Sequence, residues 1–419
     1  MKWYTKSAEQ GEATGQRLLG WCYANGSGVA KDEKEAVKWY TKSAEQGEAT
    51  GQRLLGWCYA NGSGVAKDEK EAVKWYTKSA EQGEATGQRL LGWCYANGTG
   101  VAKDDKEAVK WYTKSAEQGE GTGQRLLGWC YANGVGVAKD EEEAVKWYTK
   151  SAETGNTDAL IYLGNAYYKG LGPAKEYGKA LECYRKAAEQ GNVSGIANVG
   201  LCYETGNGIA KDEKEAMKWY AKAAEKGDGW SLQQLGLFYE NGRGVERDLK
   251  KAFEYFQKSA EAGNSWSQNR VGWDFENGTG VNKDRSKAIE WYRKSAGQGN
   301  MVAMENLGRC YANGTGVGEN MNESVEWFSR AAEKGSACAQ KSLMVIGGYA
   351  CSRNEYSLAA KCFEMAEKFG VKGAADELYR LNVELRKMWE GADPRRGILA
   401  KRKAVRGQVF YWFIFRGEA

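Results

Sequence analysis

Residues 18–47 read LLGWCYANGSGVAKDEKEAVKWYTKSAEQG, and this stretch returns along the chain at a fixed spacing. Its tryptophan in the segment KWYTKSA recurs every 36 residues, at Trp3, Trp39, Trp75, Trp111 and Trp147. A constant period of this length is typical of repeat proteins, in which each unit packs mainly on its neighbours. The fold is therefore decided by one 36-residue unit.

Each unit predicts two helices. Residues 13–25, ATGQRLLGWCYAN, carry apolar side chains at helical spacing, and Asn25-Gly26 ends this first helix because both residues tolerate a positive φ. Asp32 and Glu35 follow as a capping-box pattern, with Asp32 accepting from the first-turn amides and Glu35 reaching back. A second helix begins there. Two helices joined by so short a loop are antiparallel neighbours, and neither covers its apolar stripe alone.

The residues that recur with the repeat are, in the type unit, Gly15, Leu19, Gly20, Tyr23, Gly26, Gly28, Val29, Asp32, Ala36, Trp39, Tyr40 and Gly47. Their pattern resembles the Sel-1-like repeat, a relative of the tetratricopeptide repeat with a longer glycine loop. The resemblance covers residues 3–370. It implies an all-α fold, a right-handed α/α superhelix (solenoid) of about nine to ten helix-turn-helix repeats of 36 residues. It also implies a role as an adaptor or scaffold for protein assemblies.

Four regions differ in how closely they follow the unit. They are near-identical repeats with a truncated first unit (1–154), diverged repeats (155–335), a degenerate terminal repeat with a capping helix (336–390), and a basic and aromatic tail (391–419). We expect the tail to be disordered; contact with an anionic membrane surface or with a partner groove are the alternatives. We also expect a weak joint in the fifth repeat, where Glu176 replaces the capping aspartate and Gly178 lies inside the second helix.

The chain contains no histidine, which excludes Ser-His-Asp and Cys-His nucleophiles and histidine-containing metal sites. Identical units also supply rows of equal side chains, whereas a catalytic pocket needs different groups that converge on one point. We therefore predict that the chain is not an enzyme and that it has no catalytic residue, cofactor or metal site.

The ten cysteines include no CxxC pair, and Cys22, Cys58, Cys94 and Cys130 occupy equivalent positions. Equivalent atoms of stacked helices lie about 10 Å apart, which is too far for a disulfide. We predict buried free thiols, which suit a reducing compartment, and hence a cytoplasmic protein. The chain begins inside a repeat, so loss of a targeting segment remains an alternative.

The net charge of +5 is unevenly placed, because Lys and Arg outnumber Asp and Glu only in residues 386–419. The repeats offer no basic stripe for phosphate backbones, and no apolar run is long enough to span a membrane. The expected partner is therefore a protein or peptide and not a nucleic acid. The tail is left as the one segment that could touch a membrane surface.

The side of the first helix that faces away from the core is the candidate partner-binding surface. In the superhelix that the resemblance implies, the first helices line the concave face. Two rows of equivalent residues would lie there: Arg17, Arg53, Arg89 and Arg125, and Trp21, Trp57, Trp93 and Trp129. Arginine and tryptophan dominate binding hot spots, so such a groove suits an extended peptide. The alternative is structural: the tryptophan packs on the adjacent repeat and the arginine covers it.

The sequence therefore favours a non-enzymatic scaffold or adaptor that binds a protein or extended peptide along the concave face. One alternative is a structural spacer, which would have no exposed apolar groove. Another is a β-lactam-binding or cell-wall-ligand-binding enzyme like the cysteine-rich relatives, although those carry two bridged cysteines per unit and this chain mostly carries one.

Overall fold

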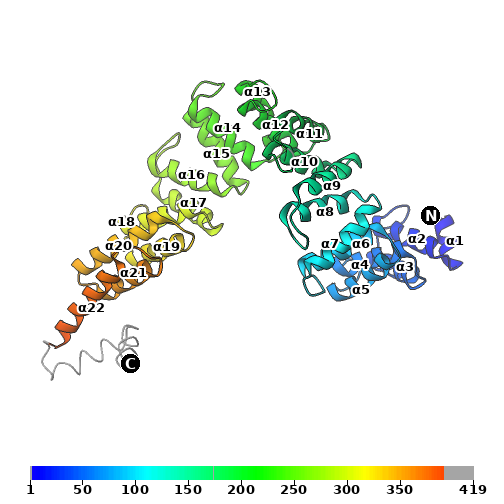
Figure 1. Ribbon diagram of the computed structural model, residues 1–419, viewed down its shortest axis with the longest axis horizontal. Coiled ribbons are helices and arrows are strands. Elements are labelled where there is room, and N and C mark those ends of the chain that lie inside the picture. The colour runs from blue at the N-terminus through cyan, green and yellow to red at the C-terminus, as the bar shows by residue number, and fades with distance from the viewer. Residues whose placement is uncertain (1, 173, 391–419) are drawn as a thin grey trace. The chain divides into compact units, whose positions relative to one another are not determined.

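The computed structural model describes residues 2–172 and 174–390, which form 22 helices and no strand (Figure 1). Within each of two compact units, consecutive helices pack as pairs and each pair packs on the next, so the described fold is an all-α solenoid. The contacts divide it into two compact units, Met1–Trp219 and Tyr220–Ala419, with the boundary inside one helix. The tail at 391–419 lies outside the described residues.

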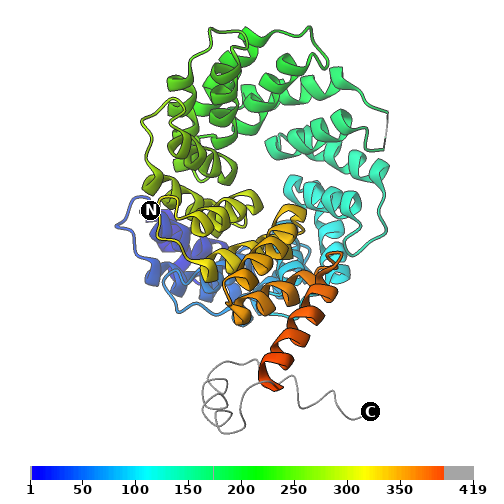
Figure 2. The same ribbon diagram turned by 90° about the vertical axis from the view of Figure 1, so that its left-hand side faces the viewer.

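The helices alternate between two positions in the repeat (Figure 2). The first helices are α2 (Ala13–Asn25), α4 (Ala49–Asn61), α6 (Ala85–Asn97), α8 (Gly121–Asn133), α10 (Thr157–Lys169), α12 (Val193–Thr205), α14 (Gly229–Asn241), α16 (Ser265–Asn277), α18 (Met301–Asn313) and α20 (Ala337–Ser352). The second helices are α1 (Lys2–Glu9), α3 (Glu33–Glu45), α5 (Glu69–Glu81), α7 (Asp105–Glu117), α9 (Glu141–Glu153), α11 (Tyr177–Glu189), α13 (Glu213–Glu225), α15 (Leu249–Glu261), α17 (Arg285–Gly297), α19 (Met321–Glu333) and α21 (Tyr356–Lys368). The last helix, α22 (Ala374–Glu390), packs on α21.

The helix ends follow the predicted chemistry with one exception. The Asp32 carboxylate accepts hydrogen bonds from the Lys34 and Glu35 amides, both at 3.0 Å, and so caps α3. The predicted return bond from Glu35 to the Asp32 amide is wrong, because that N–H donates to the Tyr23 carbonyl at 2.9 Å. Glu35 pairs with Lys38 instead. The backbone bond from Asp32 to Tyr23 closes the glycine loop onto the first helix.

Within a repeat, the two helices approach closely at a glycine. A Cβ atom on Gly20 would lie 2.7 Å from Cδ1 of Tyr40, the largest buried side chain of α3. The same pairing recurs between Gly56 and Tyr76. Any larger residue at this position would force the tyrosine ring out of the core.

Between repeats, the second glycine of the loop touches the preceding repeat. Gly64 has a φ of +70°, and a Cβ atom there would lie 2.1 Å from the Glu33 carbonyl oxygen. Gly280 stands in the same relation to Leu249, also at 2.1 Å. The loop of each repeat therefore lies directly on the backbone at the start of the previous second helix.

In the near-identical repeats, the first helices lie closer to one another than the second helices do. Contacts join α2 with α4, α4 with α6 and α6 with α8, whereas contacts between the corresponding second helices are fewer. The outward side of α2, α4, α6 and α8 is therefore one continuous surface.

The fifth repeat has the expected weak cap. Glu176 precedes α11 and its side chain makes no capping hydrogen bond, unlike Asp32 before α3. Gly178 lies inside α11, and a Cβ atom there would meet nothing within 4 Å. This glycine therefore lowers helix propensity without any packing reason.

Candidate functional site

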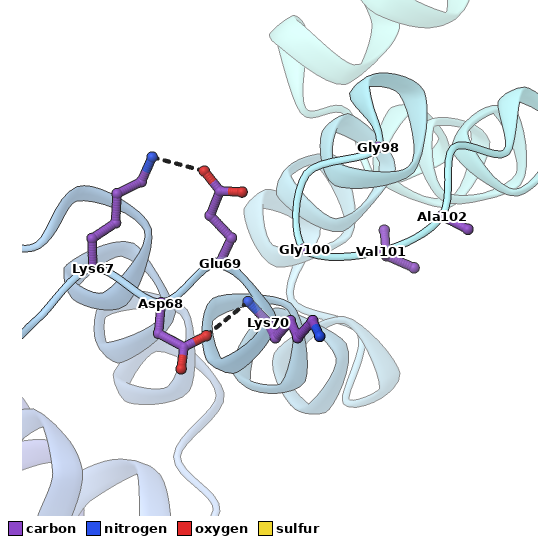
Figure 3. A pocket seen from close by; sticks show the side chains of 8 residues that line it. All are labelled: Lys67, Asp68, Glu69, Lys70, Gly98, Gly100, Val101 and Ala102. Carbon is purple, nitrogen blue, oxygen red and sulfur yellow. Dashed lines mark hydrogen bonds and ion pairs between the residues drawn. The ribbon is translucent and has the colours of Figure 1, made fainter.

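At two of the near-identical repeats, a crevice of about 700 Å³ lies between the glycine loop and the start of the preceding second helix, beside their point of contact (Figure 3). In Figure 3, the Lys67 amine points to the Glu69 carboxylate, 2.7 Å away, and Asp68 accepts from the Lys70 amide. Gly98 to Ala102 form the opposite wall. Each carboxylate shown thus serves an ion pair or a helix cap. We interpret the crevice as a packing seam between repeats.

The tryptophan row, which we define as Trp21, Trp57, Trp93 and Trp129, lies on the outward side of the first helices. The exposed fractions of these residues are 46%, 47%, 45% and 39%. By contrast Trp111, on a second helix, is only 8% exposed and lies in the core. The four indole rings therefore combine a fixed position on a rigid helix with a large area open to solvent.

Three of the four predicted arginines are held by the next repeat. Arg17 pairs with Glu48 at 3.3 Å, Arg53 with Glu84 at 3.2 Å, and Arg89 with Glu120 at 3.2 Å. These side chains are only about a fifth exposed. Each glutamate precedes a first helix and also accepts the hydrogen bond of a first-turn amide, as Glu48 does from Gly51. These arginines thus join neighbouring repeats and carry little free charge.

Arg125 is the exception among the four. The residue at the place of its expected partner is Asn156, and the Arg125 guanidinium lies over the Tyr162 ring at 5.7 Å. All four predicted tryptophans therefore lie on the surface. Of the four predicted arginines, three are held in ion pairs, and only Arg125 has no ion pair to a described carboxylate.

The second compact unit, which begins at Tyr220, also has exposed apolar side chains on the side of its first helices that corresponds to the tryptophan row. Trp273 lies at the position equivalent to Trp21 and is 41% exposed, and Trp266 on the same helix is 40% exposed. Val302 on α18 and Val345 on α20 are also exposed. Counting in steps of 36 residues from Trp21 would have located Trp273 in the sequence.

A charged cluster that the sequence analysis missed lies beside Trp273. Arg270 on α16 forms an ion pair with Glu240 on α14 and a hydrogen bond of 3.1 Å with Asp274. The Arg270 guanidinium lies 4.9 Å from the centre of the Trp273 ring. Asp274 is 1% exposed and stands where six other repeats have cysteine. Burial raises the pKa of Asp274 to about 7, although Arg270 opposes the shift.

A second charge pair lies one repeat further on. Arg309 on α18 donates two hydrogen bonds of 2.7 Å to the Glu276 carboxylate, which also accepts one from the Tyr292 hydroxyl at 2.7 Å. Burial favours the neutral form of Glu276, but Arg309 and Tyr292 outweigh it and hold its pKa below the usual range. These groups satisfy one another, so the pair joins repeats as the Arg17 pair does.

The cysteines are free thiols, as predicted, and Cys22, Cys58, Cys94 and Cys130 are buried. Burial raises the pKa of the Cys58 thiol to about 12, which keeps it protonated and unreactive. In residues 2–172 and 174–390, no three His, Cys, Asp or Glu side chains are arranged to hold a metal ion. None of the helices in these ranges is both long and apolar enough to span a membrane.

The repeat geometry agrees with a known family. A family model described as the Sel1 repeat matches residues 1–12, 13–48, 49–84, 85–120, 122–156, 157–192, 193–228, 231–264, 267–300 and 302–336. The chain belongs to the Sel1 repeat family. The resemblance and the all-α solenoid predicted from the sequence are therefore confirmed. Sel1 repeat proteins are generally scaffolds for protein interaction.

Two solved structures of this family are similar over most of the chain. One is c5321, a protective antigen present in uropathogenic Escherichia coli strains, with 31% identity over 97% of this chain and 87% of that one and a TM-score of 0.60. The other is a Sel1 repeat protein from Oxalobacter formigenes, with 33% identity over 74% and 90% of the two chains and a TM-score of 0.60. Among curated proteins, no sequence matches this chain significantly.

Proposed function

We propose that this Sel1 repeat protein is a non-enzymatic scaffold whose tryptophan row binds an extended peptide segment of a partner protein. The observation that carries the proposal is the exposure of Trp21, Trp57, Trp93 and Trp129, each about two fifths or more, on helices that contact one another. Rigid aromatic side chains that lose little entropy on binding are the usual anchors of such contacts.

The spacing of the row fits an extended chain. Packed helices lie about 10 Å apart, so four equivalent side chains span about 30 Å. A polyproline II segment advances about 3.1 Å per residue and about 9 Å per turn of three residues. One side chain in every three would then face a tryptophan, and about ten residues would cover the row.

Along most of the tryptophan row the arginine charges are already paired, which favours apolar contacts with the peptide over ionic ones. Arg17, Arg53 and Arg89 are neutralised by glutamates of the following repeats. Leu54 and Leu90, which precede Trp57 and Trp93 by three residues, are uncharged and only half-buried. We therefore expect the peptide to contribute apolar side chains or prolines at every third residue.

A purely structural spacer would have no exposed apolar groove, and the four half-exposed tryptophans disagree with this alternative. The cysteine-rich enzyme alternative has little support, because the cysteines are unpaired and the buried thiols remain protonated.

The test is selection of displayed random 12-residue peptides on the full chain, followed by binding to a variant with Trp21, Trp57, Trp93 and Trp129 replaced by alanine. We expect selected peptides to bind this variant at least about tenfold more weakly. The matched control replaces the same number of exposed second-helix lysines, Lys38, Lys74, Lys110 and Lys146, by alanine. Binding should survive there. Peptides that bind the tryptophan variant as tightly as the wild type would contradict the proposal.

A further inference from the structure

Arg125 lacks the counter-ion that its three equivalents have. Asn156 stands where a glutamate would pair with it, and the Asn156 side chain is used to cap α10 by accepting from the Ala159 amide at 3.0 Å. The Arg125 Nε is buried and has no hydrogen-bond partner, and its guanidinium forms no ion pair with a carboxylate in the described part of the chain.

A second series of bonds between repeats ends at the same place. Gln52 accepts a hydrogen bond of 2.6 Å from Gln82, and Gln88 accepts one of 2.7 Å from Gln118. Thr154 replaces the next donor, and the Oε1 atom of Gln124, a residue that is 6% exposed, has no partner. The junction between α8 and α10 is therefore where the regular bonding of the near-identical repeats stops.

The surroundings of Arg125 are aromatic. Its guanidinium lies over the Tyr162 ring at 5.7 Å, and Tyr162 stacks on Tyr148 with ring centres 5.3 Å apart. Trp129, the last member of the tryptophan row, follows Arg125 by about one helical turn and is 39% exposed. A half-buried cation beside aromatic rings gains most from a carboxylate that replaces its lost hydration.

We propose that Arg125 binds the carboxylate of an aspartate or glutamate side chain in the peptide that lies along the tryptophan row. This inference rests on the proposed function and adds a specificity determinant to it. The surface of the first helices continues past α8 onto α10, where Ile161 and Tyr162 are only half-buried, so the peptide extends beyond Arg125. A side-chain carboxylate therefore fits better than a chain terminus. It would lie within about two residues of the side chain that contacts Trp129, since Arg125 and Trp129 are about 6 Å apart along the helix.

The near-identical repeats suggest the substitution that tests the role of Arg125. Asn156→Glu gives Arg125 the partner that Arg17, Arg53 and Arg89 already have. The substituted helix should keep its cap, because Glu84 and Glu120 cap α6 and α8 from the same position. The variant therefore removes the free charge of Arg125 without removing the arginine.

The matched control is Asn192→Glu, the same substitution at the start of α12. Asn192 caps α12 as Asn156 caps α10, but the residue that corresponds to Arg125 in that pair is Ile161. This control adds the same negative charge to the same kind of helix start, away from Arg125. Thermal unfolding of both variants verifies that each is folded.

The experiment takes a peptide selected on the full wild-type chain and synthesises it in two forms, with its acidic residue as glutamate or as glutamine. On the wild type we expect the glutamate form to bind about tenfold or more tightly than the glutamine form. On Asn156→Glu the difference should fall below about twofold, and on Asn192→Glu it should persist.

Each other outcome overturns one of the two proposals. If selected peptides need the tryptophan row but show no preference for an acidic residue, or keep that preference on Asn156→Glu, the role of Arg125 is wrong and the scaffold proposal stands. If selected peptides bind regardless of the tryptophan row, or if none is selected, the scaffold proposal fails as well.

Discussion

The near-identical repeats from α2 to α9 and the diverged repeats from α14 to α19 share one backbone but are joined by different side chains. In the first group an arginine reaches the glutamate that caps the next first helix, as Arg53 reaches Glu84. In the second group asparagine caps α16 and α18, whereas Asp228 caps α14, and Asn264 donates to Gln233 at 3.0 Å from the equivalent position. The capping bond is kept in both groups. At the junction of α14 and α16, both residues of the joining pair therefore differ from the arginine and glutamate of the first group.

The two groups also differ in what they bury. The core position occupied by Cys94 in the first group is occupied by Asp274 in one repeat of the second, where Arg270 pairs with both Asp274 and Glu240. Buried thiols need no partner, but a buried carboxylate needs one. The diverged repeats thus contain a charged cluster that the near-identical repeats lack.

The largest effect on stability is expected when a buried aspartate like Asp274 is introduced into a near-identical repeat. In Cys94→Asp, the carboxyl group would lie where Leu90 takes the place of Arg270, so it must be neutralised on folding. We expect the free energy of unfolding at pH 7 to fall by about 4 kcal/mol, measured by urea denaturation with tryptophan fluorescence. A loss no larger than that of Cys94→Ser would contradict this account.

The reverse change, Asp274→Cys, should alter the pH dependence. The pKa of Asp274 is about 7 in the folded chain, above its ordinary value of 3.8. The folded state then keeps a proton that the unfolded state has released, so the free energy of unfolding falls as pH rises from about 4 to about 7. Asp274→Cys should lack this fall and be more stable at pH 8 by at least about 1 kcal/mol. Equal pH slopes in the two proteins would show that Asp274 is ionised throughout.

An intermediate effect should separate the equivalent arginines. Arg89→Ala leaves the one-fifth-exposed Glu120 without its partner and should lower the free energy of unfolding by about 1 kcal/mol. Arg125→Ala removes no ion pair to any described carboxylate and should lower it by less than about 0.5 kcal/mol. The two variants delete the same atoms from equivalent positions, so a calorimetric comparison isolates the ion pair. Equal losses would mean that the Arg89 pair adds nothing to stability.

The smallest effect is expected at the buried Ser79, in comparison with Ser259. Ser79 has a buried hydroxyl without a hydrogen-bond partner, whereas the Ser259 hydroxyl donates to the Gly229 carbonyl at 2.6 Å. Ser79→Ala should therefore leave the free energy of unfolding unchanged or slightly raised, and Ser259→Ala should lower it by about 1 kcal/mol. The thermal unfolding midpoints of the two variants test this difference. A clear loss in Ser79→Ala would indicate a bound water at that hydroxyl.

The repeat period and the capping chemistry were enough to predict the helices. The bounds of α2 and the Asp32 cap follow from local rules, because each depends on residues within one or two turns. The prediction for Glu35 was wrong because a more distant group, the Tyr23 carbonyl, takes the Asp32 amide. Contacts of this kind depend on how the loop folds back, which the capping pattern does not encode.

The candidate surface was predictable only in part. Period alone placed the tryptophans in a row, and their exposure agrees with a position outside the core. The ion pairs of Arg17, Arg53 and Arg89 were not foreseen, since they join residues 31 positions apart in neighbouring repeats. One signal was present: the glutamates at these helix starts give way to asparagine near the point where the arginines end. Asp274 gave no periodic signal, because it occurs at its position in one repeat only.

The close contact between Gly64 and the Glu33 backbone has a consequence for how such a chain can change its length. Because this contact between repeats is made by main-chain atoms, it recurs in the near-identical repeats, where a Cβ atom on Gly100 or Gly136 would lie 2.1 or 2.0 Å from the facing carbonyl oxygen. Removing residues 49–84 would bring α3 against α6, which offers α3 the same residues as α4 does now, since both helices read ATGQRLLGWCYAN. Whole repeats can thus be lost or duplicated by recombination without any compensating substitution, and the number of tryptophans in the row changes in step.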